Sequence, residues 1–142
     1  MFHKFKYEER LAMWHDFRNS VDSSENPIQD TLEYYNTAPR VSINTDPWDN
    51  ATWPDPWELV YENQYCRFCI LLGICYTLQL STHFSGSVFE IYIGVDKQKS
   101  KTLYYLCIDK NYVIDPDMLS VFDTTLLDGI HAEKVYTMPT LN

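Results

Sequence analysis

The sequence has few glycines and few basic residues, and each shortage excludes a class of function. Only four glycines occur, at positions 73, 86, 94 and 129, and none has the spacing of a phosphate-binding loop. Eleven Lys and Arg residues stand against twenty Asp and Glu residues, which gives a net charge of −9 at pH 7. Because non-specific binding to nucleic acid depends on basic side chains that neutralise phosphates, this balance argues against direct contact with nucleic acid.

The sequence also lacks a hydrophobic run long enough to cross a membrane. Its longest apolar stretch, at 55–80, is interrupted by the polar residues Glu62, Asn63, Gln64 and Arg67. The first residues contain no apolar core of a secretion signal. We therefore expect a protein that stays in the cytoplasm of the producing cell, with its four cysteines reduced.

The sequence does not contain the complete pattern of a metal site or of a redox motif. Cys66 and Cys69 form a C-x-x-C pair, but Cys75 and Cys107 do not provide a second zinc half-site, and the four histidines are scattered. A thioredoxin-type pair needs a strand before the motif and a helix that begins at it. That context is absent if a single helix starts at Pro56. We therefore predict no metal and no cofactor.

The length and composition predict one domain over residues 1–142. Hydrophobic residues make up 45% of the chain and aromatic residues 15%, which supplies a core of large rings. We expect a helical part rich in Trp and Pro at 1–54. A central helix and an antiparallel sheet should follow at 55–142.

The central stretch at 55–80 begins with a strong helix start. Asp55 is a good N-cap, the proline after it suits the first helical position, and Glu58 completes a capping box. Apolar side chains then recur at spacings of three and four, which predicts a long buried helix. Two alternatives remain for Cys66. It begins its own helix if the chain breaks near residues 63–64, and it lies mid-helix if the helix is unbroken.

In the remaining segments, apolar residues recur with the period of a helix before residue 55 and with the period of a strand after residue 80. The expected elements are helices at 7–21 and 28–38, an ordered loop at 39–54 packed over the start of the central helix, strands at 88–95, 102–108, 112–115 and 133–138, and a helical turn at 116–122. Helices that precede strands in this way predict an α+β fold, in which the central helix packs on an antiparallel meander of three to four strands.

Two segments within residues 60–118 form a further pattern. One is Cys66-Arg-Phe-Cys-Ile-Leu-Leu-Gly-Ile, and the other ends the third strand with Asp115-Pro116. Together they resemble the transglutaminase-like branch of the papain-like cysteine hydrolases. In that family a cysteine precedes an apolar helix, a histidine lies on a strand, and an Asp-Pro pair follows a later strand. The resemblance implies a nucleophile at Cys66 and an orienting carboxylate at Asp115.

The family pattern is incomplete here because its histidine is missing. Where the pattern places it, at the start of the second strand, residues 102–104 are Thr-Leu-Tyr, and the nearest histidine is His83. A cysteine needs a paired base or a positive environment to become a thiolate at neutral pH. The resemblance therefore implies one of two things. The chain is a scaffold without the activity, or it is a cysteine-dependent amidase, peptidase or acyl transferase that uses Cys66, His83 and Asp115.

Of these two, we expect the scaffold without the activity. The acidic, Tyr- and Trp-rich chain also resembles small proteins encoded by tailed bacteriophages. The resemblance implies a non-catalytic interaction or structural protein that docks on other protein subunits of an assembly, such as a bacteriophage virion. We expect it to contact neither nucleic acid nor membrane, and an oligomer is compatible with this role. Its candidate contact residues are Tyr34, Tyr35, Trp48 and Trp53.

Overall fold

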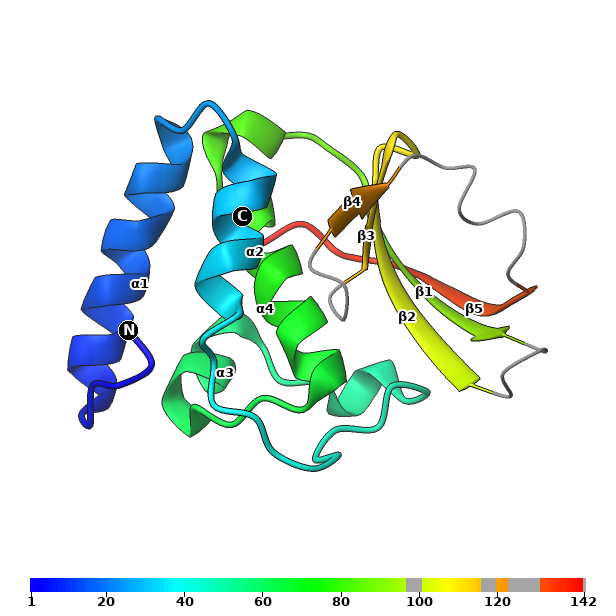
Figure 1. Cartoon of the computed structure of the whole chain (residues 1–142), viewed down its shortest axis with the longest axis horizontal. Helices are drawn as coiled ribbons and strands as arrows, with labels where there is room; N and C mark the ends of the chain where they lie inside the picture. The colour runs from blue at the N-terminus through cyan, green and yellow to red at the C-terminus, as the bar shows by residue number, and fades with distance from the viewer. Residues whose placement is uncertain (97–100, 116–119, 123–130, 142) are drawn as a thin grey trace.

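The computed structural model describes residues 1–96, 101–115, 120–122 and 131–141, with helices on one side and one antiparallel sheet on the other (Figure 1). The helices are α1 (Tyr7–Asp22), α2 (Pro27–Tyr35), α3 (Pro56–Glu62) and α4 (Arg67–Gln79), with 3-10 turns η1 (Asn50–Thr52) and η2 (Thr82–Phe84). The strands are β1 (Phe89–Asp96), β2 (Lys101–Ile108), β3 (Tyr112–Asp115), β4 (Ser120–Phe122) and β5 (His131–Thr137). The predicted α+β fold is confirmed.

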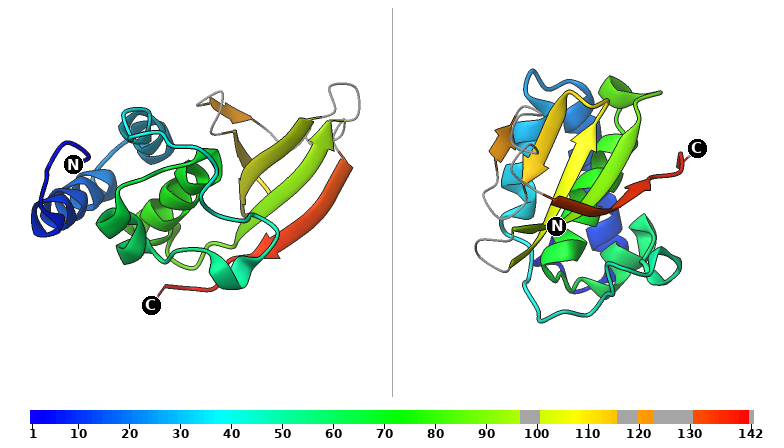
Figure 2. Two further views of the ribbon diagram at one scale, coloured as in Figure 1. Left: turned by 90° about the horizontal axis from the view of Figure 1, so that it is seen from below. Right: turned by 90° about the vertical axis from the view of Figure 1, so that its right-hand side faces the viewer.

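The sheet has five strands in the order β4-β3-β2-β1-β5. Strands β1 to β4 follow one another as a meander, and β5 returns to the opposite edge, alongside β1 (Figure 2). The last strand therefore lies at an edge, as predicted. The predicted helical turn at 116–122 is wrong for residues 120–122, which pair with β3 as strand β4, while 116–119 lie outside the described residues.

The core is built around α4, whose residues from Phe68 to Leu78 are all buried. One side of α4 packs on α2 and another side faces the sheet (Figure 1). Close packing against α2 requires a glycine, because a Cβ atom at Gly73 would lie 2.5 Å from Cε1 of Tyr35. The all-round apolar sequence of this segment therefore reflects a helix that is covered on every side.

The predicted central helix at 55–80 is in fact two helices. The predicted capping box is present, because the Glu58 backbone N–H donates to Asp55 Oδ1 over 2.8 Å, but α3 ends after two turns. Asn63 then has a left-handed backbone with φ of 51°, a conformation that asparagine tolerates better than most residues. Tyr65 next forms a parallel bridge with Arg40, and Cys66 becomes the N-cap of α4.

The buried side chain of Arg10 fixes the end of α3. Its guanidinium donates from Nε to the carbonyl oxygen of Val60 (2.9 Å) and from Nη2 to that of Tyr61 (2.8 Å). It also donates to the carbonyl oxygens of Lys4 and Phe5, which ties the N-terminal residues to the same point. The last carbonyls of a helix lack partners within the helix and carry partial negative charge, so a cation satisfies both needs.

We predict that Arg10→Met lowers the free energy of unfolding by about 2–4 kcal/mol, because it leaves several carbonyl groups unpaired. Arg10→Lys should recover only part of this loss, since an ammonium cannot reach carbonyls from two segments at once. Chemical denaturation followed by circular dichroism measures both effects. Arg18→Met on the same helix is the matched control, because the Arg18 guanidinium lies over the Trp14 ring, 4.4 Å from its centroid, and near Asp22 instead of at the end of α3. Equal losses at the two positions would contradict the role given to Arg10.

Candidate functional site

Cys66 lies immediately before the first turn of α4 and is 2% exposed. Its sulfur accepts a hydrogen bond from the Cys69 thiol and others from the backbone N–H groups of Asn44, Cys69 and Phe68. These donors, the Cys69 thiol foremost, hold the pKa of Cys66 well below its ordinary value, although burial opposes them. The break before α4 therefore gives Cys66 a positive environment without any basic side chain.

Cys69 has the opposite environment, one turn further along the same helix. Its hydrogen bond to Cys66 and its burial both raise the pKa of the Cys69 thiol. Thr45 Oγ1 lies 3.2 Å from its sulfur, and Asn44 Oδ1 is a second acceptor for the thiol proton at 3.6 Å. Within the pair, the negative charge is therefore favoured on Cys66 and the proton on Cys69.

A cavity of about 280 Å³ opens beside Cys66. It is lined by Cys66, Arg67, Phe68 and Tyr104 together with Ile43, Thr45 and Pro47 from the loop at 39–54. This loop packs over the start of α4, where the ring of Trp53 lies 4.9 Å from that of Phe68, whereas the prediction placed it over the helix start at Asp55. The cavity therefore combines a stabilised sulfur with mainly apolar walls.

On the sheet side of this cavity, Tyr104 of β2 occupies the position nearest to the start of α4. Its ring is 5.3 Å from that of Phe68, and the Arg67 guanidinium lies over it, 4.6 Å from the centroid. The same guanidinium donates to the carbonyl oxygen of Thr102 over 2.8 Å. Tyr104 and Arg67 therefore form one wall of the cavity beside Cys66.

The structure does not bring His83 to Cys66. His83 is an exposed residue of η2, which follows the C-terminal end of α4, whereas Cys66 precedes its N-terminal end. A helix of 13 residues separates the two by about 20 Å at 1.5 Å per residue. His83 is therefore out of hydrogen-bond reach of the thiol.

Asp115 is buried at the end of β3, but it does not converge on Cys66 either. Side chains alternate between the two faces of a strand, and Ile114 belongs to the core beneath α4 whereas Val113 packs on the opposite face. Asp115 pairs in register with Ser120 and therefore continues this alternation on the side of Val113. Of the three predicted catalytic residues, the structure places only Cys66 at the cavity.

The four predicted contact residues differ widely in exposure. Tyr35 is 2% exposed, and its hydroxyl lies 3.0 Å from Thr77 Oγ1 inside the core. Tyr34 is partly buried and stacks on Phe17, and Trp53 packs between the rings of Phe68 and Tyr136. Only Trp48 is exposed, at 48%. The placement of Tyr35 on the surface was therefore wrong, whereas Tyr34 and Trp53 are partly exposed and, with Trp48, stay predicted contact residues.

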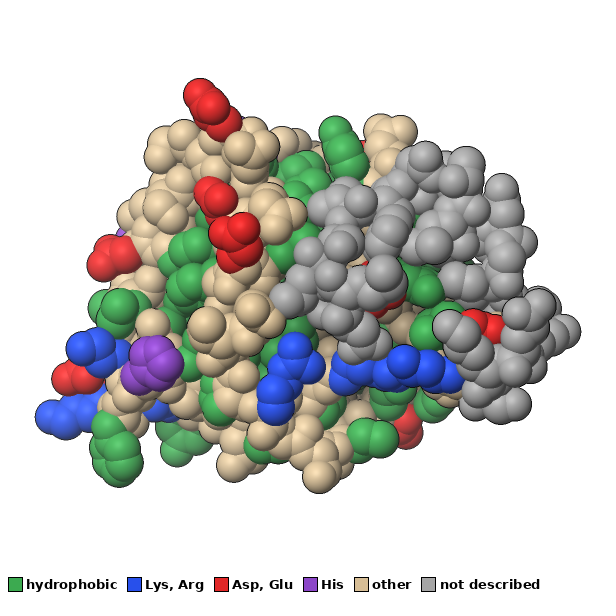
Figure 3. Space-filling model, viewed as in Figure 1, with side chains coloured by type: hydrophobic (Ala, Val, Ile, Leu, Met, Phe, Trp, Pro, Cys, Tyr) green, Lys and Arg blue, Asp and Glu red, His purple; other side chains and the backbone are tan. Residues whose placement is uncertain are grey.

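The most exposed apolar side chains lie elsewhere, and include Phe5 (96%), Ile43 (83%) and Tyr61 (64%). On the face shown in Figure 3, apolar side chains occur in small groups between polar ones rather than as one continuous patch. Ile43 is distinct among them because it also lines the cavity beside Cys66. The sequence offered no signal for this, since Ile43 was assigned only to an ordered loop.

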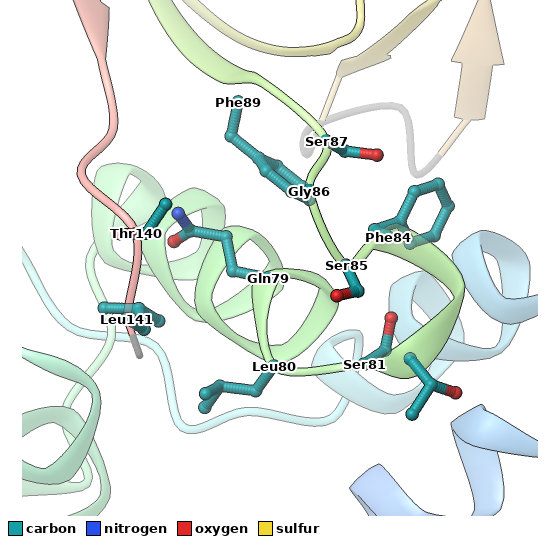
Figure 4. A pocket seen from close by; sticks show the side chains of 11 residues that line it. Gln79, Leu80, Ser81, Phe84, Ser85, Gly86, Ser87, Phe89, Thr140 and Leu141 are labelled. Carbon is teal, nitrogen blue, oxygen red and sulfur yellow. The ribbon is translucent and has the colours of Figure 1, made fainter.

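Another cavity, of about 220 Å³, lies at the opposite end of α4 (Figure 4). Phe84 and Phe89 contribute rings to it, and Ser81 and Ser85 contribute hydroxyls. No charged or thiol side chain is among the described residues that line it. Its chemistry is therefore limited to hydrogen bonding and apolar contact.

Two further searches concern the described residues only. No helix among them is long and apolar enough to cross a membrane. No group of three or more His, Cys, Asp or Glu side chains in the described ranges is arranged to hold a metal ion.

We predict that Cys66 alkylation by iodoacetamide keeps nearly the same rate from pH 6 to pH 9, because a thiol with a lowered pKa is already ionised across this range. Cys69→Ala removes the foremost donor and should move the midpoint of the rate profile to higher pH, whereas Cys69→Ser keeps a donor and should restore much of the shift. Peptide mass spectrometry at several pH values follows the rate. A profile that rises up to about pH 9, as for a free thiol, would contradict a stabilised thiolate.

No protein-family model matches the chain, and no curated protein matches it in sequence. Solved structures do match. LapG from Legionella pneumophila in its calcium-bound form has a TM-score of 0.69 at 9% identity, over 94% of this chain and 77% of that one. A further LapG structure gives 0.67 at 11% identity, with the same coverage, and the EGTA-treated form gives 0.66 at 10%, over 94% and 75%. At such identities the likeness is one of fold, and this chain therefore has the transglutaminase-like fold of LapG.

Proposed function

We propose that the chain is a non-catalytic protein with a transglutaminase-like fold, which binds another protein subunit at the cavity beside Cys66. The observation that carries the proposal is the position of Tyr104 and Arg67, which fill the sheet side of this cavity. A thiolate alone can attack a carbonyl carbon. A complete acyl transfer from an amide also needs a group that gives a proton to the leaving amine and later activates water.

A histidine suits this second task because imidazole exchanges a proton near neutral pH. A tyrosine does so poorly, since a phenol ordinarily titrates near 10. Among the described side chains that line the cavity, Tyr104 is the sole hydroxyl-bearing ring, and Arg67 is held in place by the Thr102 carbonyl. The cavity therefore lacks, in its described part, the proton exchange that turnover requires.

The same cavity has the character of a binding site. Ile43 stands 83% exposed at its edge, and Trp48 is exposed on the same loop. An apolar centre with aromatic neighbours is typical of the part of an interface that contributes most to affinity. With a net charge of −9, the chain favours a partner whose surface is basic around the inserted apolar side chain.

The assembly to which such a partner belongs is a separate matter. The predicted place in a bacteriophage virion gains no support from LapG, which comes from a bacterium. An oligomer of this chain and a hetero-assembly both remain compatible with the proposal.

A second candidate function is a cysteine-dependent amidase, peptidase or acyl transferase. The observation that favours it is the lowered pKa of Cys66 beside an open cavity. It requires a base other than His83, which lies beyond the far end of α4.

p-Nitrophenyl acetate distinguishes the two candidates, because its leaving group departs without a proton. We expect a burst of at most one equivalent of p-nitrophenolate per chain, followed by the background rate, since Cys66 can be acylated but the thioester is not hydrolysed. Cys66→Ala should abolish the burst. Continued release over many equivalents that depends on Cys66 would overturn the non-catalytic proposal and favour the enzyme.

Photo-crosslinking tests the binding surface. With p-benzoylphenylalanine at position 43, irradiation of the producing cells should give one main crosslinked product, because this side chain stands at the edge of the cavity. The same group at Gln29, an exposed position on α2, is the matched control and should not give it. The partner peptide should carry Lys or Arg near the crosslink, and Trp48→Ala should lower the yield at least about twofold. The same products at both positions would refute this surface, and a product of two copies would reassign it to self-association.

A further inference from the structure

The pair Cys66 and Cys69 remains unexplained by a binding role. Cys66 is the N-cap of a helix of 13 residues and Cys69 lies in its first turn, with the C-x-x-C spacing that the sequence showed. Residues three apart on a regular helix have Cβ atoms about 5–6 Å apart, whereas a disulfide needs about 3.5–4.5 Å, so the Cys66 side chain must approach Cys69 further. Both thiols lie at the same end of α4, and the interaction with the Cys69 thiol is the foremost cause that lowers the pKa of Cys66.

The backbone at Cys66 leaves its side chain free to approach Cys69 further. As the N-cap, Cys66 has an extended conformation with φ of −70° and ψ of 170°, outside the regular helix. The helix that the C-x-x-C motif requires therefore begins at Cys66, contrary to the expectation for a single helix from Pro56. A thioredoxin fold is not needed for this local arrangement.

We propose that Cys66 and Cys69 form a dithiol site that small hydroperoxides such as hydrogen peroxide oxidise to a disulfide, with Cys66 as the reacting thiol and Cys69 as the resolving thiol. Cys66 lines the cavity, whereas Cys69 is held behind it by Thr45 and Asn44. Their opposite pKa shifts are consistent with these roles. The inference does not rest on the proposed binding function, and either can fail alone.

The reaction balances with the hydroperoxide as the two-electron oxidant. The Cys66 thiolate attacks one peroxide oxygen, the O–O bond breaks, and water leaves once the departing hydroxide has taken up a proton. The sulfur is then a sulfenic acid. The Cys69 sulfur attacks it, the S–O bond breaks, the hydroxyl leaves as a second water with the Cys69 proton, and the S–S bond forms. Two thiols and one hydrogen peroxide thus give one disulfide and two waters.

The small exposed area of Cys66 favours a compact oxidant. Its side chain is 2% exposed, at the end of a cavity of about 280 Å³. Hydrogen peroxide is little larger than water and can reach the sulfur. Glutathione disulfide must bring its own sulfur into line with the thiolate, which its peptide arms hinder, so we expect it to react more slowly.

The other two cysteines serve as internal controls. Cys75 is fully buried two turns further along α4, where its thiol donates to Gln79 Oε1 over 3.5 Å. Cys107 packs in the small cluster on the face of the sheet away from α4. All four cysteines are reduced in this structure, so an oxidation experiment starts from four free thiols.

The experiment treats the reduced full-length chain with hydrogen peroxide, blocks the remaining thiols with N-ethylmaleimide, and maps the peptides by mass spectrometry. We expect the number of free thiols to fall from four to two, with a Cys66–Cys69 disulfide that dithiothreitol reverses. Cys66 should react at least about tenfold faster than Cys75, because the thiolate is the reactive species. Equal molar glutathione disulfide should give a slower reaction.

Variants separate the two thiols. Cys69→Ser should stop at a sulfenic acid on Cys66 that dimedone traps, Cys66→Ser should lose the fast reaction, and Cys75→Ser and Cys107→Ser should behave as the unaltered chain. A disulfide that involves Cys75 or Cys107, or accumulation of Cys66 sulfinic acid without a disulfide in the unaltered chain, would overturn the proposal. The peptide map of the unaltered chain decides these outcomes even if a variant does not fold.

Discussion

The site depends on one feature of the backbone, the interruption between α3 and α4. A continuous helix would pair the N–H groups of Phe68 and Cys69 with carbonyls one turn earlier. Because the helix starts afresh, these N–H groups have no partner within α4 and can donate to the Cys66 sulfur. The same few residues therefore set the charge of the thiol, the opening of the cavity and the direction in which α4 enters the core.

Segments distant in sequence hold this interruption in place. Arg10 of α1 takes up the last carbonyls of α3, and Asn63 donates from Nδ2 to the Phe2 carbonyl over 3.0 Å. On the other side, the Tyr65 backbone bonds to Pro39 and Val41 at the start of the loop that covers α4. Since Tyr65 is itself fully buried, sliding the chain by one residue would expose a large ring. Tertiary contacts therefore fix the break, although Asn63 also tolerates the left-handed backbone that the break requires.

This explains how far the sequence could predict the structure. The helix start at Asp55 and the strands of the meander were predictable, because capping residues and alternation of period two act locally. The polar pair at 63–64 pointed to a break but could not establish it, since the partners that fix it lie at the N-terminus and near residue 40. Periodicity also could not show that Tyr35 is buried, because a tyrosine ring can lie on either the buried or the exposed face of an amphipathic helix. The partner of β3 at 120–122 was missed because a strand of three residues shows too little alternation.

The candidate site, like the fold, could be predicted from the sequence only in part. Cys66 and the missing histidine were visible in the sequence, whereas the roles of Tyr104 and Arg67 depended on which strand faces the start of α4. A cysteine hydrolase needs a stabilised thiolate and a group that exchanges protons. In the described part of this chain, the start of α4 favours the first, whereas the β2 side chain at the cavity is Tyr104, a ring that lies under the Arg67 guanidinium. The backbone N–H groups and the neighbouring thiol lower the pKa of Cys66 although none of these donors is a basic side chain.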